Sequence, residues 1–91
     1  MTKVVQPFRI EVPDAMLADL RERLARTRFP DQIDGANWDY GTELSYLREL
    51  VAYWKDGFDW RAQERLLNSF PHFKTRIDDH SVHFIHARSP H

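Results

Sequence analysis

The chain has 91 residues, 13 lysines and arginines against 14 aspartates and glutamates, a formal net charge of −1 and no cysteine. This length allows one small domain that buries only about 60–65% of its unfolded surface. The balanced charge gives no whole-chain basis for binding nucleic acid, and the lack of cysteine excludes disulfides and thiolate metal sites. No long apolar run opens the chain, so we expect neither a signal peptide nor a membrane anchor here, and a soluble, cytoplasmic protein.

The first thirty residues predict an extended segment followed by a helix. Residues 1–6 show no pattern and are expected to fray, whereas apolar and charged residues alternate over 8–12, as in a half-buried strand. Pro13 and Asp14 open a helix, which must end near Thr27 because Pro30 disfavours the helical region at the residue before it. The apolar face of this helix is formed by Leu17, Leu20 and Leu24.

The same helix carries the basic cluster of the chain. Acidic Asp19 and Glu22 lie among its arginines, which is typical of a solvated face with basic residues near a helix C-terminus. We therefore expect no nucleic-acid partner. The four arginines are Arg21, Arg23, Arg26 and Arg28.

Residues 38–70 hold all three tryptophans and all three tyrosines and predict two helices. Thr42 is placed to cap the first helix, and Gly57 is placed to end it. Asp59 is placed to cap the second helix, which Pro71 stops. Such aromatic density usually forms a core, so Trp54→Ala is expected to cost about 3–5 kcal/mol. The inward positions predicted for the first helix are Leu44, Leu47, Leu50, Val51 and Trp54, and for the second Leu66 and Leu67.

Two segments without helical periodicity complete the chain. Residues 29–41 form a long loop whose apolar Ile33, Trp38 and Tyr40 either pack on the helices of this domain or await a partner surface. Residues 73–87 predict a β-hairpin with a polar turn at Asp78-Asp79-His80. Its apolar side chains fall on both faces, as in strands that are covered on both sides.

The residues give no sign of an active site. His80, His83 and His86 are spaced by three, so on a strand His83 points away from the other two and they do not converge on a metal. No serine lies in a Gly-x-Ser-x-Gly turn, and the glycines form no phosphate loop. We therefore expect no catalytic, cofactor-binding or metal-binding residue in this chain. His91, the last residue, does not alter this expectation.

Several separated pieces of sequence nevertheless occur in a familiar order over nearly the whole chain. They are Leu20 to Arg23, Arg26 to Pro30, Trp38-x-Tyr40-Gly41, Tyr53-Trp54, Phe58-Asp59-Trp60, Leu67-Asn68 and His83-Phe84-Ile85-His86. The set resembles the N-terminal domain of microsomal-type epoxide hydrolases. The Asp78-Asp79-His80 turn departs from that family, where a glycine is common.

The resemblance implies a domain that precedes an α/β-hydrolase fold and wraps across it and its lid. It also implies that the full protein hydrolyses an epoxide to a diol through an ester on an aspartate, with lid tyrosines polarising the oxygen and a histidine activating water. All those residues would lie downstream, so we expect the chain alone to be inactive. The hydrophobic anchor of the family's membrane-bound members is also missing.

We therefore predict a mainly α fold (α+β) of about three helices with a C-terminal β-hairpin that resembles the first two strands of an α/β-hydrolase sheet. Residues 1–72 would form the helical N-terminal domain and residues 73–91 the hairpin leading into the hydrolase domain. The expected partner is that downstream domain, or a second copy of the chain. The candidate interdomain contacts are Trp38, Tyr40, Phe73, Phe84 and His86.

Two other classes of function stay open at this point. In the first, the chain is a free-standing interaction module whose loop and hairpin edge bind another protein. In the second and weaker one, the arginine helix makes it a small nucleic-acid binder. A reading frame that continues into a hydrolase core would favour the epoxide hydrolase domain, whereas salt-dependent binding would favour the nucleic-acid binder.

Overall fold

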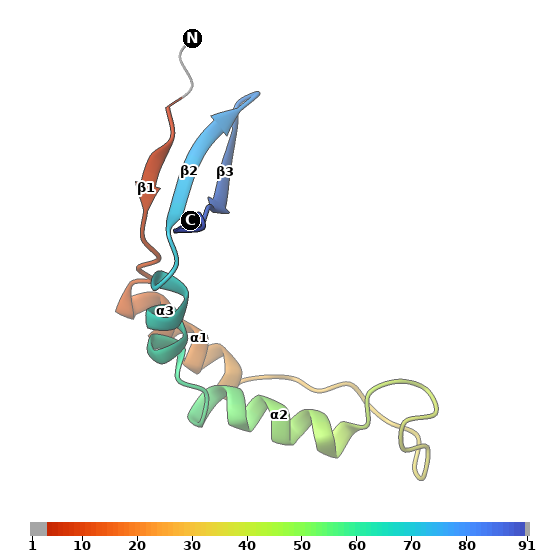
Figure 1. The fold of residues 1–91 in the computed structure, drawn as a ribbon. Coiled ribbons are helices and arrows are strands. Elements are labelled where there is room, and N and C mark those ends of the chain that lie inside the picture. The colour runs from red at the N-terminus through yellow and green to blue at the C-terminus, as the bar shows by residue number, and fades with distance from the viewer. Residues whose placement is uncertain (1–3, 91) are drawn as a thin grey trace. The chain divides into compact units, whose positions relative to one another are not determined.

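The computed structural model describes residues 4–90, so the fraying expected of residues 1–3 and the terminal His91 lie outside the described part of the chain. The described residues form three helices and three strands in the order β1, α1, α2, α3, β2, β3 (Figure 1). The chain divides into two compact units: the sheet unit, residues 4–11 and 59–90, and the helix-pair unit, Val12–Phe58. The predicted fold class is confirmed, with one strand added. The boundary expected at residue 72 stays a prediction.

The sheet unit consists of an antiparallel three-stranded sheet and one helix. The strands β1 (Gln6–Phe8), β2 (His72–Ile77) and β3 (His80–Ile85) lie in the order β1-β2-β3. The helix α3 (Trp60–Asn68) begins as predicted, because the Asp59 side chain accepts a hydrogen bond of 3.1 Å from the Ala62 N–H.

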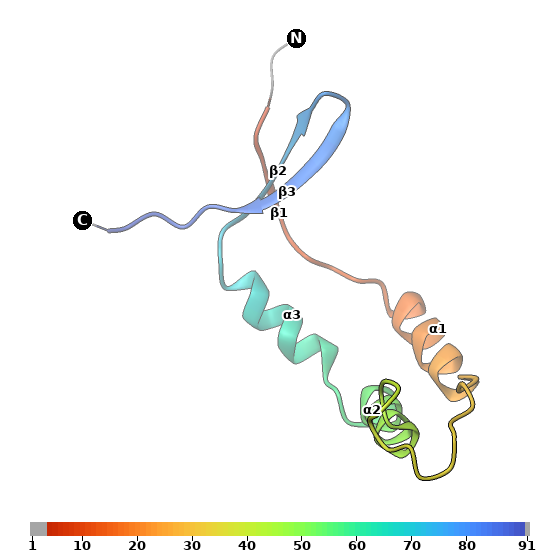
Figure 2. The same cartoon turned by 90° about the vertical axis from the view of Figure 1, so that its right-hand side faces the viewer.

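The predicted hairpin is confirmed, and its strands alternate as expected. Phe73 pairs with Phe84 and Thr75 with Val82 on one face, whereas Ile85 pairs with His72 on the other. Figure 2 shows the tight turn at the tip of the hairpin.

Ile77 pairs with His80, so the turn itself has two residues rather than the three predicted. Asp78 and Asp79 both have positive φ, 49° and 68°, as a type I′ hairpin turn requires. Aspartate tolerates this conformation better than most non-glycine residues, which explains how the turn forms without the family's glycine.

The third strand differs from the sequence-based prediction. Gln6 already begins β1 and pairs with Lys74, so the expected fraying through residue 6 is wrong at that residue. Pro7 is compatible with this position because β1 is an edge strand with one side unpaired, where a missing N–H is tolerated. The alternating segment 8–12 contributes only Phe8 to the sheet.

The helix-pair unit contains α1 (Asp14–Ala25) and α2 (Leu44–Asp56), which pack against each other. α1 begins as predicted after Pro13 and ends two residues before Thr27, whose hydroxyl donates to the Leu24 carbonyl at 2.7 Å. In Figure 2, the connection between the two helices passes around the N-terminal end of α2. The half-buried apolar side chains of the pair are Leu17, Leu20 and Leu24 on α1 and Leu44, Leu47 and Val51 on α2.

The predicted aromatic core is wrong for the described chain. Ala36, at 8% exposure, is the one buried apolar residue among residues 4–90. Trp54 is 47% exposed and Leu50 is 46% exposed, so neither faces inward as predicted. The physical reason is geometric: the apolar arc of α2 is wider than the surface that a single neighbouring helix covers.

Candidate functional site

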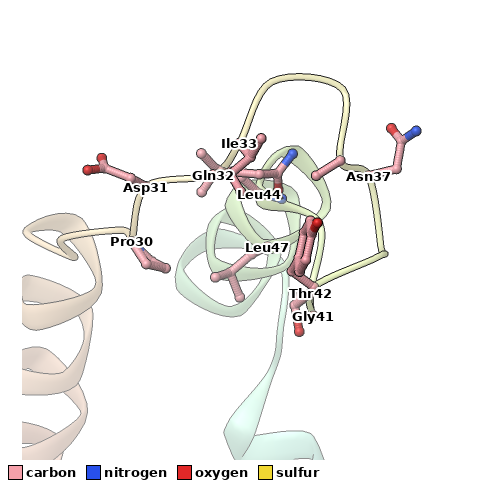
Figure 3. Close-up of a pocket in the computed structure, with 11 residues that line it drawn as sticks. Pro30, Asp31, Gln32, Ile33, Asn37, Gly41, Thr42, Leu44 and Leu47 are labelled. Carbon is pink, nitrogen blue, oxygen red and sulfur yellow. Dashed lines mark hydrogen bonds between the residues drawn. The ribbon is translucent and has the colours of Figure 1, made fainter.

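The loop between α1 and α2 folds back on itself and forms an open pocket. Three hydrogen bonds close successive turns: Ala36 N to Ile33 O at 3.1 Å, Asp39 N to Ala36 O at 2.9 Å, and Gly41 N to Trp38 O at 3.3 Å. The pocket has a volume of about 500 Å³ and lies between this loop and the first turn of α2 (Figure 3). Its apolar lining includes Pro30, Ile33, Tyr40, Leu44 and Leu47.

Two side chains fasten this loop to the start of α2. The Gln32 side-chain oxygen accepts a hydrogen bond of 2.6 Å from Leu44 N. The Glu43 carboxylate accepts from Ser45 N at 3.0 Å, Tyr46 N at 2.7 Å and the Ser45 hydroxyl at 2.5 Å. Glu43 is therefore the cap, and the prediction of Thr42 was wrong by one position.

These hydrogen bonds make Glu43 an unusually strong acid. The Ser45 hydroxyl first, and then the N–H groups of Ser45 and Tyr46, stabilise the charged form and lower the pKa of the Glu43 carboxyl from its usual 4.5 to about 2. A negative charge at a helix N-terminus is also favoured by the helix dipole. Glu43 thus holds a fixed charge beside the pocket.

The predicted contact candidates in the loop are both accessible. Tyr40 is 82% exposed at the pocket rim. Trp38 lies against Tyr46 of α2, with ring centroids 5.2 Å apart, and still leaves more than half of its surface exposed.

Trp38 and Tyr46 belong to a larger exposed surface on α2, which sequence reasoning missed. Tyr46, Leu50, Tyr53 and Trp54 follow one another at helical spacing, and all are exposed. The helical spacing of these residues could have revealed a second apolar face. It was missed because Leu50 and Trp54 were assigned to the inward face. We call this surface the aromatic stripe; its members are Trp38, Tyr46, Leu50, Tyr53 and Trp54.

The other three contact candidates lie in the sheet unit. Phe73 and Phe84 face each other across β2 and β3, with centroids 5.7 Å apart, and both are half-buried. His86 is exposed just beyond β3, and its backbone N–H donates to the Pro71 carbonyl at 3.1 Å. The structure brings the two phenylalanines together.

The opposite face of the sheet carries an imidazole pair that the sequence did not reveal. His72, only 5% exposed, has its Nδ1 2.8 Å from His83 Nε2, and its Nε2 2.5 Å from the Leu67 carbonyl. Because a carbonyl only accepts, His72 donates through Nε2 and, when neutral, accepts from His83 through Nδ1. The pair therefore ties β3 to the end of α3 through β2.

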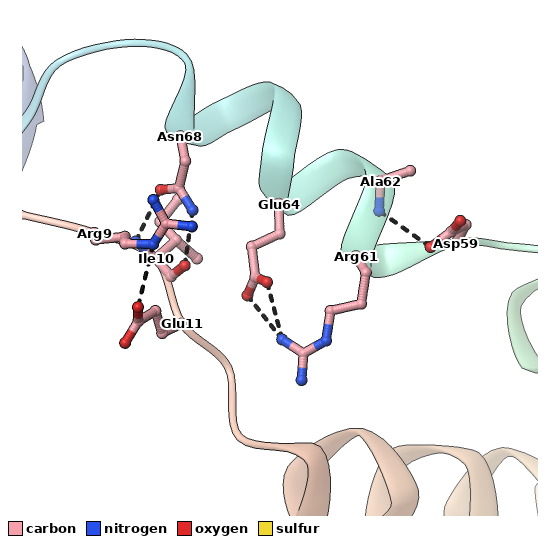
Figure 4. A network of polar contacts seen from close by, with 8 residues as sticks. All are labelled: Arg9, Ile10, Glu11, Asp59, Arg61, Ala62, Glu64 and Asn68. Carbon is pink, nitrogen blue, oxygen red and sulfur yellow. Dashed lines mark hydrogen bonds and ion pairs between the residues drawn. The ribbon is translucent and has the colours of Figure 1, made fainter.

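Polar contacts also fix α3 within the sheet unit (Figure 4). The Asn68 side chain accepts from Ile10 N and donates to Ile10 O, both at 2.9 Å. Glu64, at 8% exposure, accepts from Arg61 Nη1 at 2.9 and 3.2 Å. A buried carboxylate needs such a partner, and Arg61 supplies it from the same helix, three residues away.

Ser69 and two arginines of the basic cluster have local partners. The Ser69 hydroxyl donates to the Leu66 carbonyl at 2.6 Å, a helix-end role like that of Ser45. Arg23 pairs with Asp19 at 2.9 Å and Arg26 with Glu22 at 3.4 Å, as on a solvated helix face. Within residues 4–90, no three histidine, aspartate or glutamate side chains are placed to hold a metal, and no helix is long and apolar enough to cross a membrane.

A comparison with known protein families decides what this fold is. The family model described as the epoxide hydrolase N terminus matches residues 5–91. The chain belongs to the epoxide hydrolase N-terminal family. The resemblance read from the separated sequence pieces is therefore confirmed.

Relatives of this epoxide hydrolase N-terminal domain are much longer proteins. It is 44% identical over 87 residues to a putative epoxide hydrolase of Stigmatella aurantiaca, covering 96% of this chain and 20% of that protein. It is 38% identical over 86 residues to epoxide hydrolase 1 of Oryctolagus cuniculus, and this match covers 94% of this chain and 19% of that protein. The chain thus spans about a fifth of the length of the relatives that it matches.

A solved structure shows the same arrangement. The juvenile hormone epoxide hydrolase of the silkworm Bombyx mori matches with a TM-score of 0.82 at 29% identity, over 92% of this chain and 22% of that one. The epoxide hydrolase N-terminal domain therefore keeps its fold where the sequences have diverged.

Proposed function

We propose that the protein to which this N-terminal domain belongs hydrolyses epoxides to vicinal diols, through an ester formed on an aspartate of its catalytic domain. The observation that carries the proposal is the 44% identity to the Stigmatella aurantiaca putative epoxide hydrolase across 96% of this chain. Because the match covers 20% of that protein, the chemistry is assigned to the part that follows.

The role proposed for this chain is to pack on the hydrolase domain and its lid. The scarcity of buried apolar residues supports it, since Ala36 is the one buried apolar residue in the described chain, while Trp38 and Tyr40 are exposed. A small domain with large exposed aromatic side chains gains stability when a further surface covers them.

Hydrogen bonds within the chain occupy two serine hydroxyls and the buried histidine, which supports a structural role for these side chains. Ser45 donates to Glu43, and Ser69 donates to a backbone carbonyl. His72 bonds to His83 and Leu67, so it is not positioned to activate a serine hydroxyl. A cytoplasmic location and self-association remain predictions.

The test is a chimera in which this chain replaces the matching 87 residues of the Stigmatella aurantiaca relative. We expect the chimera to convert styrene oxide to its diol, and the purified 91-residue chain alone to show only the buffer rate. A chimera that is insoluble or inactive, beside an active parent, would contradict the proposal. Turnover by the chain alone would contradict its non-catalytic role.

The free-standing interaction module makes a different prediction for the same experiment. A self-contained module would fold without supporting a foreign catalytic domain, so the chimera would lose activity. The family match along 5–91 favours the epoxide hydrolase domain.

A further inference from the structure

The hydrogen positions of the neutral His72–His83 pair follow from one backbone carbonyl. His72 is buried, and its Nε2 lies 2.5 Å from the Leu67 carbonyl, which only accepts, so this nitrogen carries a hydrogen. In the neutral pair, His72 Nδ1 is therefore the acceptor and His83 Nε2, 2.8 Å away, is the donor. The remaining nitrogen of the pair is Nδ1 of His83, on an exposed residue.

One proton enters this arrangement without breaking a hydrogen bond. It binds to Nδ1 of the exposed His83, and the Nε2–H of the same ring continues to donate to His72. The donor is then charged, which strengthens the hydrogen bond. A pair that carries one proton therefore still connects β3 to the end of α3 through β2.

A second proton breaks the connection between the two rings. The nitrogen left to bind it is Nδ1 of His72, which faces His83 Nε2 at 2.8 Å. Both facing nitrogens then carry hydrogens and neither accepts, while both rings are positively charged. The buried His72 ring is left with a charge and an unpaired N–H, a state that is costly away from water.

The strands around the pair supply no negative charge to offset the second proton. From β1, the pair meets the uncharged Phe8 ring, whose centroid is 4.7 Å from that of His83. From β2, Lys74 stands opposite His83, with its ammonium 4.6 Å from the Phe8 centroid, and adds a positive charge. The register places on this face of the sheet Gln6, Phe8, His72, Lys74, Arg76, Ser81, His83 and Ile85, none of them acidic.

The helix α3 favours a charge on His72 but gives its Nδ1 no acceptor. The negative end of the helix dipole lies at the carbonyls of the last turn, which include that of Leu67. That carbonyl accepts from His72 Nε2 whether the ring is neutral or charged. Glu64, the buried carboxylate of α3, is paired with Arg61.

We propose that the His72–His83 pair is a pH-sensitive switch of the sheet unit, closed with no proton or one and open with two. Opening separates the two rings and disconnects the edge strand β3 from the end of α3. In the unfolded chain the rings are apart, so that state binds more protons than the closed pair. The stability of the sheet unit therefore falls as the pH falls through the second step.

Nitrogen-15 NMR of the histidine rings in the 91-residue chain tests the order of the two protons, because it distinguishes both neutral tautomers from the charged ring. The pH is lowered from about 8, through the range in which histidines usually change charge, until the sheet unit unfolds. We expect His83 to become charged first, while the exchange of the β3 backbone amides, corrected for its intrinsic pH dependence, is unchanged. We expect His72 to become charged only in the step in which that exchange rises, by about tenfold or more.

Two results of this titration would overturn the switch. One is a charged His72 in a sheet whose β3 amides keep their protection. The other is a loss of β3 protection as soon as the first of the two rings becomes charged.

His83→Gln tests whether the facing of two donors causes the opening. A glutamine amide donates to neutral His72 through its nitrogen and, after turning, accepts from charged His72 through its oxygen. We expect this variant to keep β3 protected to a pH lower than in the wild-type chain by about one unit or more. His86→Gln, the matched control, removes an exposed histidine just beyond β3 and should not move the step.

A step at the same pH in His83→Gln and in the wild-type chain would assign the opening to another group and overturn the proposal. If His83→Gln does not fold, the ring spectra of the wild-type chain decide between the two.

Discussion

Ile10 and Asn68 lie 58 positions apart and exchange two hydrogen bonds, each of 2.9 Å. The Asn68 amide offers an acceptor and a donor side by side, as a backbone peptide in a neighbouring strand does. It thereby pairs the chain just beyond β1 with the last residue of α3. This contact closes the sheet unit between segments from the two ends of the chain.

Asn68→Ala is expected to destabilise the sheet unit by about 1–3 kcal/mol, because it leaves the part-buried N–H and carbonyl of Ile10 without these partners. Hydrogen exchange measured by NMR would show faster exchange of the Ile10 amide. Gln63→Ala, at an exposed position of the same helix, is the control and should change little. Unchanged protection of Ile10 in Asn68→Ala would show that the two bonds do not hold this segment.

Glu43→Ala should shorten or fray the N-terminus of α2, and the size of the effect should depend on pH. The folded-state pKa of Glu43 is lowered to about 2 from 4.5, so its stabilising contribution is fully present above pH 4.5 and is lost as the pH falls toward 2. Thermal melts by circular dichroism should therefore show a gap between wild type and Glu43→Ala that closes across this window. A gap that persists at the acid end would mean that the carboxylate charge is not what caps the helix.

Trp54→Ala and Leu47→Ala together test which side of α2 is packed. Trp54 is 47% exposed, so its truncation in the isolated chain should cost about 1 kcal/mol or less, in place of the 3–5 kcal/mol expected of a buried tryptophan. Leu47 is half-buried in the helix pair, and its truncation should cost about 2 kcal/mol. The reverse order of melting temperatures would place Trp54 inward and contradict the exposed stripe.

The isolated chain should self-associate through the sheet unit. β3 is an edge strand, and Ile85, its last residue, is half exposed. An edge strand with an exposed apolar side chain pairs readily with strands of other chains. Sedimentation velocity should show association that rises with concentration and is reduced by Ile85→Lys. Ser81→Lys adds the same charge to the same face of β3 without removing an apolar side chain. It therefore distinguishes the effect of the added charge from the effect of losing the Ile85 side chain. A monomer at every concentration would contradict this prediction.

The elements that depend on neighbours a few positions away could be predicted from the sequence. The start of α1 after Pro13, the Asp59 cap of α3 and the alternation of side chains along the hairpin strands all followed from periodicity and local hydrogen bonding. The family also followed from the sequence, because its short motifs keep their order and spacing along the chain.

Only the tertiary structure decided the contacts between distant segments and which apolar surface is left uncovered. The pairing of Gln6 with Lys74, the bonds between Ile10 and Asn68, and the imidazole pair within β2 and β3 have no signature in local pattern. Periodicity showed that α2 is apolar but not how much of its circumference one neighbouring helix covers. The covered part of α2 depends on which distant segments pack together in the folded chain. Burial is set by neighbours in space and not by neighbours in sequence.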